Sequence, residues 1–114
     1  MRITLTTTGR RSGKQRSVEL YGYEDGDSIV IVGSNGGKKR DPGWVHNLRA
    51  HPRATVTRGK TEREVAAEEA RGKRRERAWE LAASEFPLYR RYQDRTDRQI
   101  PVFILEPVKG AAGR

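Results

Sequence analysis

The sequence predicts a mainly β fold with peripheral helices, in the form of a small antiparallel barrel. Six short runs of β-branched and apolar residues are joined mostly by tight turns, which is typical of an antiparallel sheet that closes on itself. Two other segments repeat their apolar residues at helical spacing. The length of 114 residues leaves room for one domain over residues 1–109, followed by a tail over residues 110–114 that we expect to be flexible.

Three strands are expected before the first helix. Residues 2–8 alternate and are rich in Thr, which predicts a strand, and residues 15–24 predict a second one. Asp25 and Gly26 indicate a hairpin turn, because glycine adopts the positive φ of a tight primed turn at little cost. Residues 28–33 form a continuous apolar run between turns, which predicts a strand that is buried on both faces.

A short helix is expected to follow. Asp41 and Pro42 are a helix-start signal, with Asp41 as the N-cap and Pro42 at the first helical position. Trp44 and Leu48 are four residues apart and therefore share one helix face, which we expect to point to the core. The helix is expected to stop before Pro52.

The rest of the chain adds three strands and two helices. Residues 53–58 and 61–69 predict two strands joined by a turn. The segment 73–86 is rich in Ala, Glu and Arg and carries apolar residues on one face, so it predicts a helix, and a second short helix is expected over residues 87–92. Residues 101–106 predict the last strand.

Composition restricts the chemistry of the partner. The chain carries 24 Lys and Arg against 15 Asp and Glu, a net charge of +9, which favours a polyanionic partner such as nucleic acid, anionic lipid or a phosphorylated cofactor. The absence of cysteine excludes disulfides and thiolate chemistry. The two histidines, His46 and His51, have no acidic partners in a metal-binding pattern, so we expect no metal site. The sequence shows no signal peptide or apolar span, and we expect a cytoplasmic protein.

The first candidate site is the basic turn over residues 9–16. Four cations and the hydroxyl of Ser12 surround a turn bounded by Gly9 and Gly13, an arrangement that suits phosphate or carboxylate. It is not a Walker loop, because only three residues separate the glycines and Gln15 stands where Ser or Thr would hold magnesium. A solvated hairpin loop is the alternative, and composition does not separate the two.

The second candidate is the loop over residues 33–40, directly after the buried strand. Its backbone N–H groups, Ser34 and its lysines are able to bind an anion near a helix N-terminus. A flexible surface loop is the alternative interpretation. The aromatic residues Phe86, Tyr89 and Tyr92, at spacings of three, either wall a pocket for a flat ligand or belong to the core.

The basic stretch over residues 71–77 is a further candidate. Its simplest interpretation is a solvated helix face, and a nucleic-acid surface is the rival. The stretch has no interleaved exposed aromatic residues and matches no nucleic-acid-binding motif, so we expect no nucleic-acid partner.

Taken together, these segments resemble the deazaflavin (coenzyme F-420)-dependent nitroreductase family. The resemblance begins at residues 5–13 (Leu-Thr-Thr-Thr-Gly-Arg-Arg-Ser-Gly) and covers residues 3–107 in order. The other matching blocks are residues 34–37 (Ser-Asn-Gly-Gly), 42–48 (Pro-Gly-Trp-Val-His-Asn-Leu), 47–52 (Asn-Leu-Arg-Ala-His-Pro), 89–92, 96–98 (Thr-Asp-Arg) and 100–102 (Ile-Pro-Val). It implies a split β-barrel of the FMN-binding-protein type with about six mostly antiparallel strands.

The resemblance also implies a reaction. The enzyme would transfer a hydride from reduced coenzyme F-420, a deazaflavin with a phosphodiester and an oligoglutamate tail, to a quinone, a nitro compound or an activated alkene. The chemistry would then belong to the cofactor, and the protein would bind, orient and polarise. Two alternatives are an FMN-dependent enzyme of the same fold and a non-enzymatic polyanion-binding protein.

The resemblance assigns site residues by their position in this sequence. The anionic part of the cofactor would be held by Arg10, Arg11, Ser12, Lys14 and Arg16. The strand beside the cofactor would supply Ser17, Val18, Glu19, Leu20 and Tyr21. The ring region would be contacted by Val32, Gly33, Ser34 and Asn35, and the other side would be closed by Gly43, Trp44, Val45, His46 and Asn47. The acceptor pocket would be lined by Phe86, Tyr89 and Tyr92.

Three residues are the candidates for catalysis. Ser34 would hydrogen-bond the acceptor as negative charge develops, and Tyr21 or Tyr92, or water, would supply the proton. We expect a small-molecule acceptor, a monomer or homodimer, and at most weak contact with the inner face of a membrane. Relatives often carry an N-terminal segment before the Thr-Thr-Thr-Gly signature, and we expect no membrane-contacting helix before it here.

Overall fold

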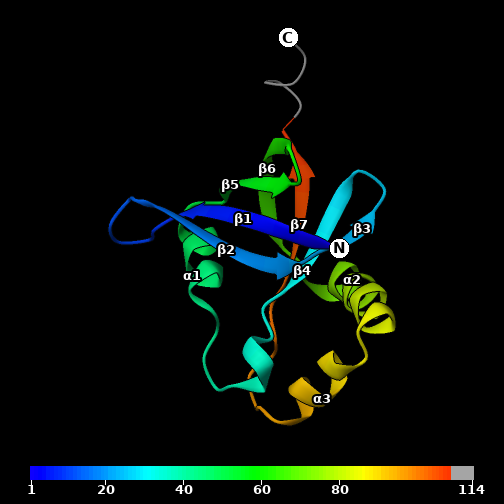
Figure 1. Ribbon diagram of the computed structural model, residues 1–114. Coiled ribbons are helices and arrows are strands. Elements are labelled where there is room, and N and C mark those ends of the chain that lie inside the picture. The colour runs from blue at the N-terminus through cyan, green and yellow to red at the C-terminus, as the bar shows by residue number, and fades with distance from the viewer. Residues whose placement is uncertain (109–114) are drawn as a thin grey trace.

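The computed structural model describes residues 1–108 and shows one antiparallel sheet curved into a half barrel, with helices packed against it (Figure 1). The sheet order is β2-β1-β5-β6-β7-β4-β3. The strands are β1 (Arg2–Thr8), β2 (Gln15–Tyr21), β3 (Tyr23–Asp25), β4 (Ser28–Val32), β5 (Arg53–Arg58), β6 (Thr61–Glu69) and β7 (Val102–Pro107). The helices are α1 (Gly43–Ala50), α2 (Gly72–Glu85) and α3 (Leu88–Asp94), with a 3-10 turn η1 (Asn35–Gly37). The predicted fold class is confirmed, whereas the tail over residues 110–114 lies outside the described residues.

The strand expected over residues 15–24 is in fact two strands, so the prediction of six strands was one short. The break falls at Gly22, where a Cβ atom would lie only 2.6 Å from Ile29 Cγ2. The N–H of Gly22 donates to the carbonyl of Met1, directly before β1, at 2.8 Å. Residues before the break pair with β1 and those after it pair with β4. Gly22 therefore connects β2, the strand at one end of the sheet order, to β3, the strand at the other end.

The start of α1 differs from the prediction. Pro42 is the N-cap residue and Gly43 the first helical residue, with no side-chain cap hydrogen bond. The prediction of Asp41 as N-cap was wrong because its carboxylate accepts hydrogen bonds from Arg98 and Arg49 instead. Arg98 is 57 residues away in the sequence and Arg49 is eight, so neither belongs to the local pattern of a helix start.

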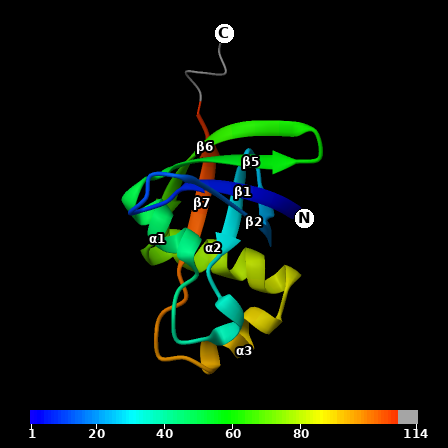
Figure 2. The same cartoon turned by 60° about the vertical axis from the view of Figure 1, so that its left-hand side comes forward.

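Two apolar clusters occupy the two faces of the sheet, and β4 contributes to both. Ile31 packs in the first cluster with Trp44 and Phe103, whose rings meet edge-on at 5.8 Å. Val30 and Val32 point the other way, into the second cluster with α2 and α3. Figure 1 shows α1 and α2 on either side of β7, and Figure 2 shows α3 below α2. The prediction that this strand is buried on both faces is confirmed.

The chain leaves β4 through a position that requires glycine. The N–H of Gly33 donates to the carbonyl of Pro101 at 2.8 Å. A Cβ atom at Gly33 would lie 2.8 Å from Val45 Cγ2 and 3.0 Å from Pro101 Cγ. The backbone therefore passes closer to α1 and to the segment before β7 than a side chain would permit.

We predict that Gly33→Ala lowers the free energy of unfolding by about 1–3 kcal/mol, because the extra methyl overpacks a buried contact. The matched control is Gly43→Ala. At Gly43 a Cβ atom would meet nothing within 4 Å, and alanine is up to about 1 kcal/mol better than glycine inside a helix. Urea unfolding of both variants checks the prediction. Equal stabilities of the two would contradict the close approach at Gly33.

Candidate functional site

The candidate site is a cavity of about 1070 Å³ between β2, the start of α1 and the loop that joins β4 to α1. Its volume exceeds that of most pockets for drug-sized ligands, which is typically about 300–1,000 Å³. The lining residues are Thr7, Arg16, Ser17, Val18, Glu19, Leu20, Tyr21, Val32, Ser34, Asn35, Gly36, Lys38, Arg40, Asp41, Pro42, Gly43, Trp44, Asn47 and Tyr89.

One wall of the cavity is the edge strand β2. This strand pairs only with β1, and most of its side chains are exposed. Val18 is 38% exposed and Tyr21 is 56% exposed, which makes them two of the largest exposed apolar side chains in the described chain. Exposed apolar side chains that gather at a concave surface mark a ligand site. All five residues predicted on this strand, from Ser17 to Tyr21, line the cavity.

Buried side chains from three other elements also reach the cavity. Val32 ends β4, Trp44 is the second residue of α1, and Tyr89 belongs to α3. The hydroxyl of Tyr89 shares a hydrogen bond of 2.8 Å with the hydroxyl of Tyr23. Burial, together with that hydrogen bond, raises the pKa of Tyr89 well above its usual value, so this phenol stays protonated. These three side chains offer a mostly apolar surface with one neutral hydroxyl.

The remaining side of the cavity is cationic. Arg16 comes from β2, and Lys38 and Arg40 come from the loop before α1. None of the three forms an ion pair within residues 1–108, so their charge is available to an anion. The basic stretch over residues 71–77 is different, because three of its four arginines are paired with carboxylates and the fourth, Arg75, donates to the carbonyl of Ile100. The pairs are Arg71 with Glu69, Arg74 with Glu68 and Arg77 with Asp25.

The structure brings together thirteen of the predicted site residues and leaves nine outside the cavity lining. The thirteen are Arg16, Ser17, Val18, Glu19, Leu20, Tyr21, Val32, Ser34, Asn35, Gly43, Trp44, Asn47 and Tyr89. Those outside are Arg10, Arg11, Ser12, Lys14, Gly33, Val45, His46, Phe86 and Tyr92. The first four lie at the tip of the β1–β2 hairpin, whereas Gly33 and Val45 are buried in packing contacts.

The aromatic residues Phe86, Tyr89 and Tyr92 pack mainly in the core, and of the three only Tyr89 lines the cavity. Tyr89 packs edge-on against Phe86, with ring centroids 4.9 Å apart, and both belong to the second apolar cluster or its margin. Tyr92 lies behind η1, where a Cβ atom on Gly37 would be 3.0 Å from the carbonyl oxygen of Tyr92. The backbone of η1 thus lies against α3 at Tyr92.

Sequence reasoning did not name six of the lining residues as site residues. They are Thr7, Gly36, Lys38, Arg40, Asp41 and Pro42. Lys38 and Arg40 do belong to the basic loop that suggested an anion site, but the turn η1 decides which cations reach the cavity. Thr7 is buried, and its Oγ1 accepts a hydrogen bond of 3.0 Å from Asn47. Asn47 also accepts from the N–H of Arg10 at 3.0 Å, so it ties the hairpin to α1.

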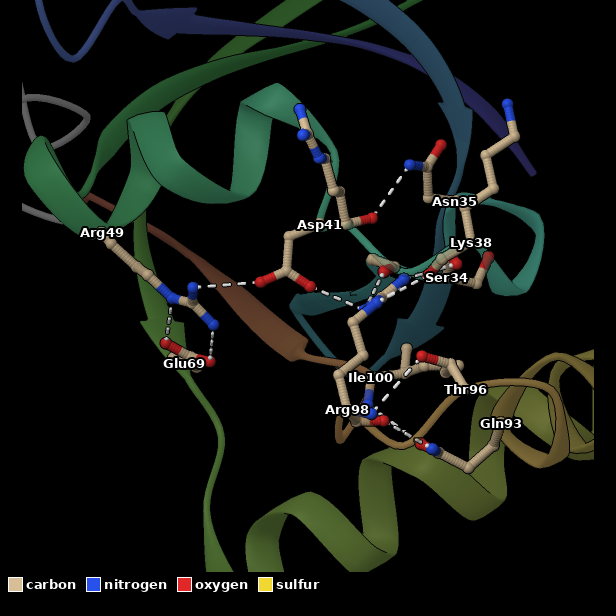
Figure 3. A network of polar contacts seen from close by, with 12 residues as sticks. Ser34, Asn35, Lys38, Asp41, Arg49, Glu69, Gln93, Thr96, Arg98 and Ile100 are labelled. Carbon is tan, nitrogen blue, oxygen red and sulfur yellow. Dashed lines mark hydrogen bonds and ion pairs between the residues drawn. The ribbon is translucent and has the colours of Figure 1, made fainter.

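Behind the cationic loop lies a polar network centred on Arg98 (Figure 3). The Arg98 guanidinium donates to the Asp41 carboxylate at 2.6 Å and to backbone carbonyls of the loop. Asp41 also accepts from Arg49 at 3.2 Å. Arg49 in turn makes two hydrogen bonds to Glu69, of 2.9 and 2.7 Å, which lower the pKa of that carboxyl. The network links the loop to α1 and β6.

These features fit a flat ring that carries an anionic chain. Apolar side chains on β2, Val32 and Trp44 offer surfaces for a ring, and three cations suit phosphate or carboxylate. Within residues 1–108 no group of three or more His, Asp or Glu side chains is placed to hold a metal ion. Across the same residues, no helix is both long enough and apolar enough to span a bilayer.

Comparisons with known proteins agree with this geometry. The profile of the family described as F420H(2)-dependent quinone reductase matches residues 1–107. An F420H(2)-dependent quinone reductase from Mycobacterium tuberculosis is 36% identical over 106 residues, which cover 90% of this chain and 71% of the relative.

Solved structures of relatives show the same fold. An F420-H2 dependent reductase, FDR-A, is 40% identical, with a TM-score of 0.85 over 92% of this chain and 93% of that chain. A second structure, described as a domain-swapped dimer, is also 40% identical, with a TM-score of 0.86 over 92% of this chain and 79% of that chain. The protein thus belongs to the F420H(2)-dependent quinone reductase family, a family of oxidoreductases whose reductant is reduced coenzyme F-420.

Proposed function

We propose that this protein binds the reduced deazaflavin coenzyme in the cavity beside β2 and reduces a quinone there. The observation that carries the proposal is the meeting of two surfaces in one cavity. The apolar residues Val18, Leu20 and Tyr21 of the exposed strand β2 line the same cavity as three cations that have no ion-pair partner within residues 1–108. An apolar ring with an anionic chain complements both surfaces at once.

We assign the ring to the apolar part of the cavity and the phosphate to its cations. Leu20, Val32 and Trp44 would contact the ring, and Arg16, Lys38 and Arg40 would neutralise the phosphate. Arg10, Arg11 and Lys14 lie on the adjoining hairpin tip, and they too form no ion pair within residues 1–108. They would serve the oligoglutamate tail, which extends from the phosphate. This assignment keeps the predicted role of the hairpin and adds the two cations of the loop.

When bound, the coenzyme supplies the hydride, and the protein orients both reactants and stabilises charge. Ser34 lines the cavity, which supports its hydroxyl as the donor that would stabilise the developing oxyanion of the acceptor. Tyr21 also lines the cavity and is exposed, which supports it or water as the proton donor. Tyr92 does not line the cavity, which leaves its predicted proton-donor and acceptor-binding roles without support from the geometry.

The first prediction concerns the cations of the loop. We expect the double variant Lys38→Gln and Arg40→Gln to weaken binding of the oxidised coenzyme by roughly 10- to 100-fold, since hydrogen bonds to charged groups contribute about 1.5–3 kcal/mol. The plot of log Kd against log salt should also become shallower. Fluorescence titration of the coenzyme measures both quantities, with FMN as the competing ligand.

The matched control removes the same charge elsewhere. Lys60→Gln with Lys73→Gln alters two exposed lysines outside the cavity lining, neither of which forms an ion pair in the part of the chain that the structure describes. Equal weakening in both double variants would mean that only net charge matters. Binding of FMN without the coenzyme would keep the fold and move the chemistry to a flavin, and binding of neither would overturn the proposal.

The second prediction concerns Ser34. Ser34→Ala should lower kcat for quinone reduction roughly 100-fold, the usual effect of removing one oxyanion donor, while Kd for the coenzyme stays within about twofold. Steady-state kinetics and fluorescence titration separate the two effects. Ser84→Ala is the control, because that hydroxyl bonds to the Leu81 carbonyl on the exposed side of α2. Unchanged turnover in Ser34→Ala would remove Ser34 from the mechanism.

A further inference from the structure

We propose that Arg98 is a positioning residue, which holds the loop over residues 33–41 in the conformation that binds the coenzyme. The inference rests on the proposed function for its ligand, but its structural part stands on contacts of this chain alone. Arg98 itself does not line the cavity. Its action would pass through the backbone of the loop.

The guanidinium of Arg98 contacts the loop at four places. Its Nη1 donates to the Gly33 carbonyl at 3.3 Å and to Asp41 Oδ1 at 2.6 Å. Its Nη2 donates to the Ser34 carbonyl at 2.8 Å, and its Nε donates to the Lys38 carbonyl at 2.9 Å. The acceptors lie on both sides of η1 and at the beginning and end of the loop. One planar group therefore fixes the loop at its entry, around its turn and at its exit.

The segment that carries Arg98 is itself held in place. The side chain of Gln93 donates to the Arg98 carbonyl at 2.7 Å and accepts from the N–H of Ile100 at 2.9 Å. The N–H of Arg98 donates to Thr96 Oγ1 at 3.4 Å. Figure 3 shows these contacts on the side of Arg98 away from the loop. Arg98 is thus anchored to Gln93 near the end of α3 and, through it, to the buried Ile100, two residues before β7. We call Arg98 with these contacts the clamp.

The charge of Arg98 is compensated locally. The side chains of Arg98 and Asp41 are each only 16% exposed. Removing one partner of such a pair leaves the other charge poorly solvated, which is more disruptive than losing a surface ion pair. Arg49 shares the Asp41 carboxylate and is bound in turn by Glu69 of β6. The ion pairs that begin at Arg98 therefore extend through Asp41 and Arg49 to the sheet.

Lysine would not replace this group. A guanidinium presents its N–H donors in one rigid plane, whereas an ammonium is a compact point charge on a flexible stem. Contact with three carbonyls and a carboxylate uses all three nitrogens of Arg98. Arg98→Lys keeps the positive charge beside Asp41 but loses the planar set of N–H donors. The variant therefore tests the geometry of the contacts separately from their charge.

The clamped loop has a backbone that needs support. Asn35, Gly36 and Gly37 have φ of 48°, 65° and 81°, so three consecutive residues have a positive φ. Such a conformation in a non-glycine residue persists only when the surroundings impose it. Asn35 is also held by its side chain, which donates to the Arg40 carbonyl at 3.0 Å. The residues that reach the cavity, Lys38 and Arg40 among them, depend on this turn for their position.

The test compares Arg98→Lys with Arg91→Lys, which alters an exposed arginine of α3 that forms no ion pair or side-chain hydrogen bond within residues 1–108. At a temperature at which circular dichroism shows all three proteins folded, we expect Arg98→Lys to weaken Kd for the oxidised coenzyme at least 10-fold. Amide hydrogen exchange should rise selectively in the peptide over residues 33–41. Adding the coenzyme should slow that exchange, because binding must then order the loop. Arg91→Lys should match the wild type in both measurements.

Two results would overturn the inference. One is a lower Tm for Arg98→Lys with unchanged Kd and unchanged exchange in the loop, which would make Arg98 a stabilising residue only. The other concerns Asp41→Asn, the variant to use if Arg98→Lys does not fold. Wild-type exchange over residues 33–41 in Asp41→Asn would refute the clamp. Failure of the wild type to bind the coenzyme would refute the proposed function, and the exchange comparison would still decide the role of Arg98.

Discussion

The structure depends on the antiparallel pair of β4 and β7, which is shared by both apolar clusters. Ile31 and Phe103 are opposite each other in the register and face the first cluster, whereas the neighbouring pair Val32 and Val102 faces the second. A shift of either strand by one residue would turn every one of these side chains to the wrong cluster. The end of β4 is therefore a fixed point, and the loop that borders the cavity starts from it.

The cavity also depends on the open side of the half barrel. Gly22 lets the chain turn from the end of the sheet at β2 to the end at β3 within a single residue. This leaves β2 with one neighbour and with apolar side chains such as Val18 that no other strand covers. In an ordinary edge strand such exposure favours aggregation. A bound ring would cover the exposed apolar side chains of β2, which would explain why this edge strand carries them.

The basic residues discussed above fall into two groups, those that pair with carboxylates and those that lie at the cavity or on the adjoining hairpin. Arginines on α2 meet carboxylates of β6 and β3, and Arg98 and Arg49 meet Asp41 and Glu69 behind the loop. The basic residues of the cavity and the adjoining hairpin have no such partners in the part of the chain that the structure describes. Arg98 and Arg16 carry the same charge in different surroundings. Arg98 contacts three backbone carbonyls and a carboxylate, whereas Arg16 lines the cavity.

Most strands, the helices and the core face of α1 could be predicted from the sequence alone, because alternation, helical spacing and turn residues are local properties. The role of residues 17–21 beside the cofactor came from the family resemblance and not from these patterns. The sequence also determined the family, since the motifs recur in order along the chain. Three features became evident from the folded chain alone: Asp41 binds Arg98 instead of capping α1, residues 15–24 break at Gly22, and Lys38 and Arg40 line the cavity whereas Tyr92 does not. These outcomes depend on groups that are distant in sequence and meet only after the sheet has curved.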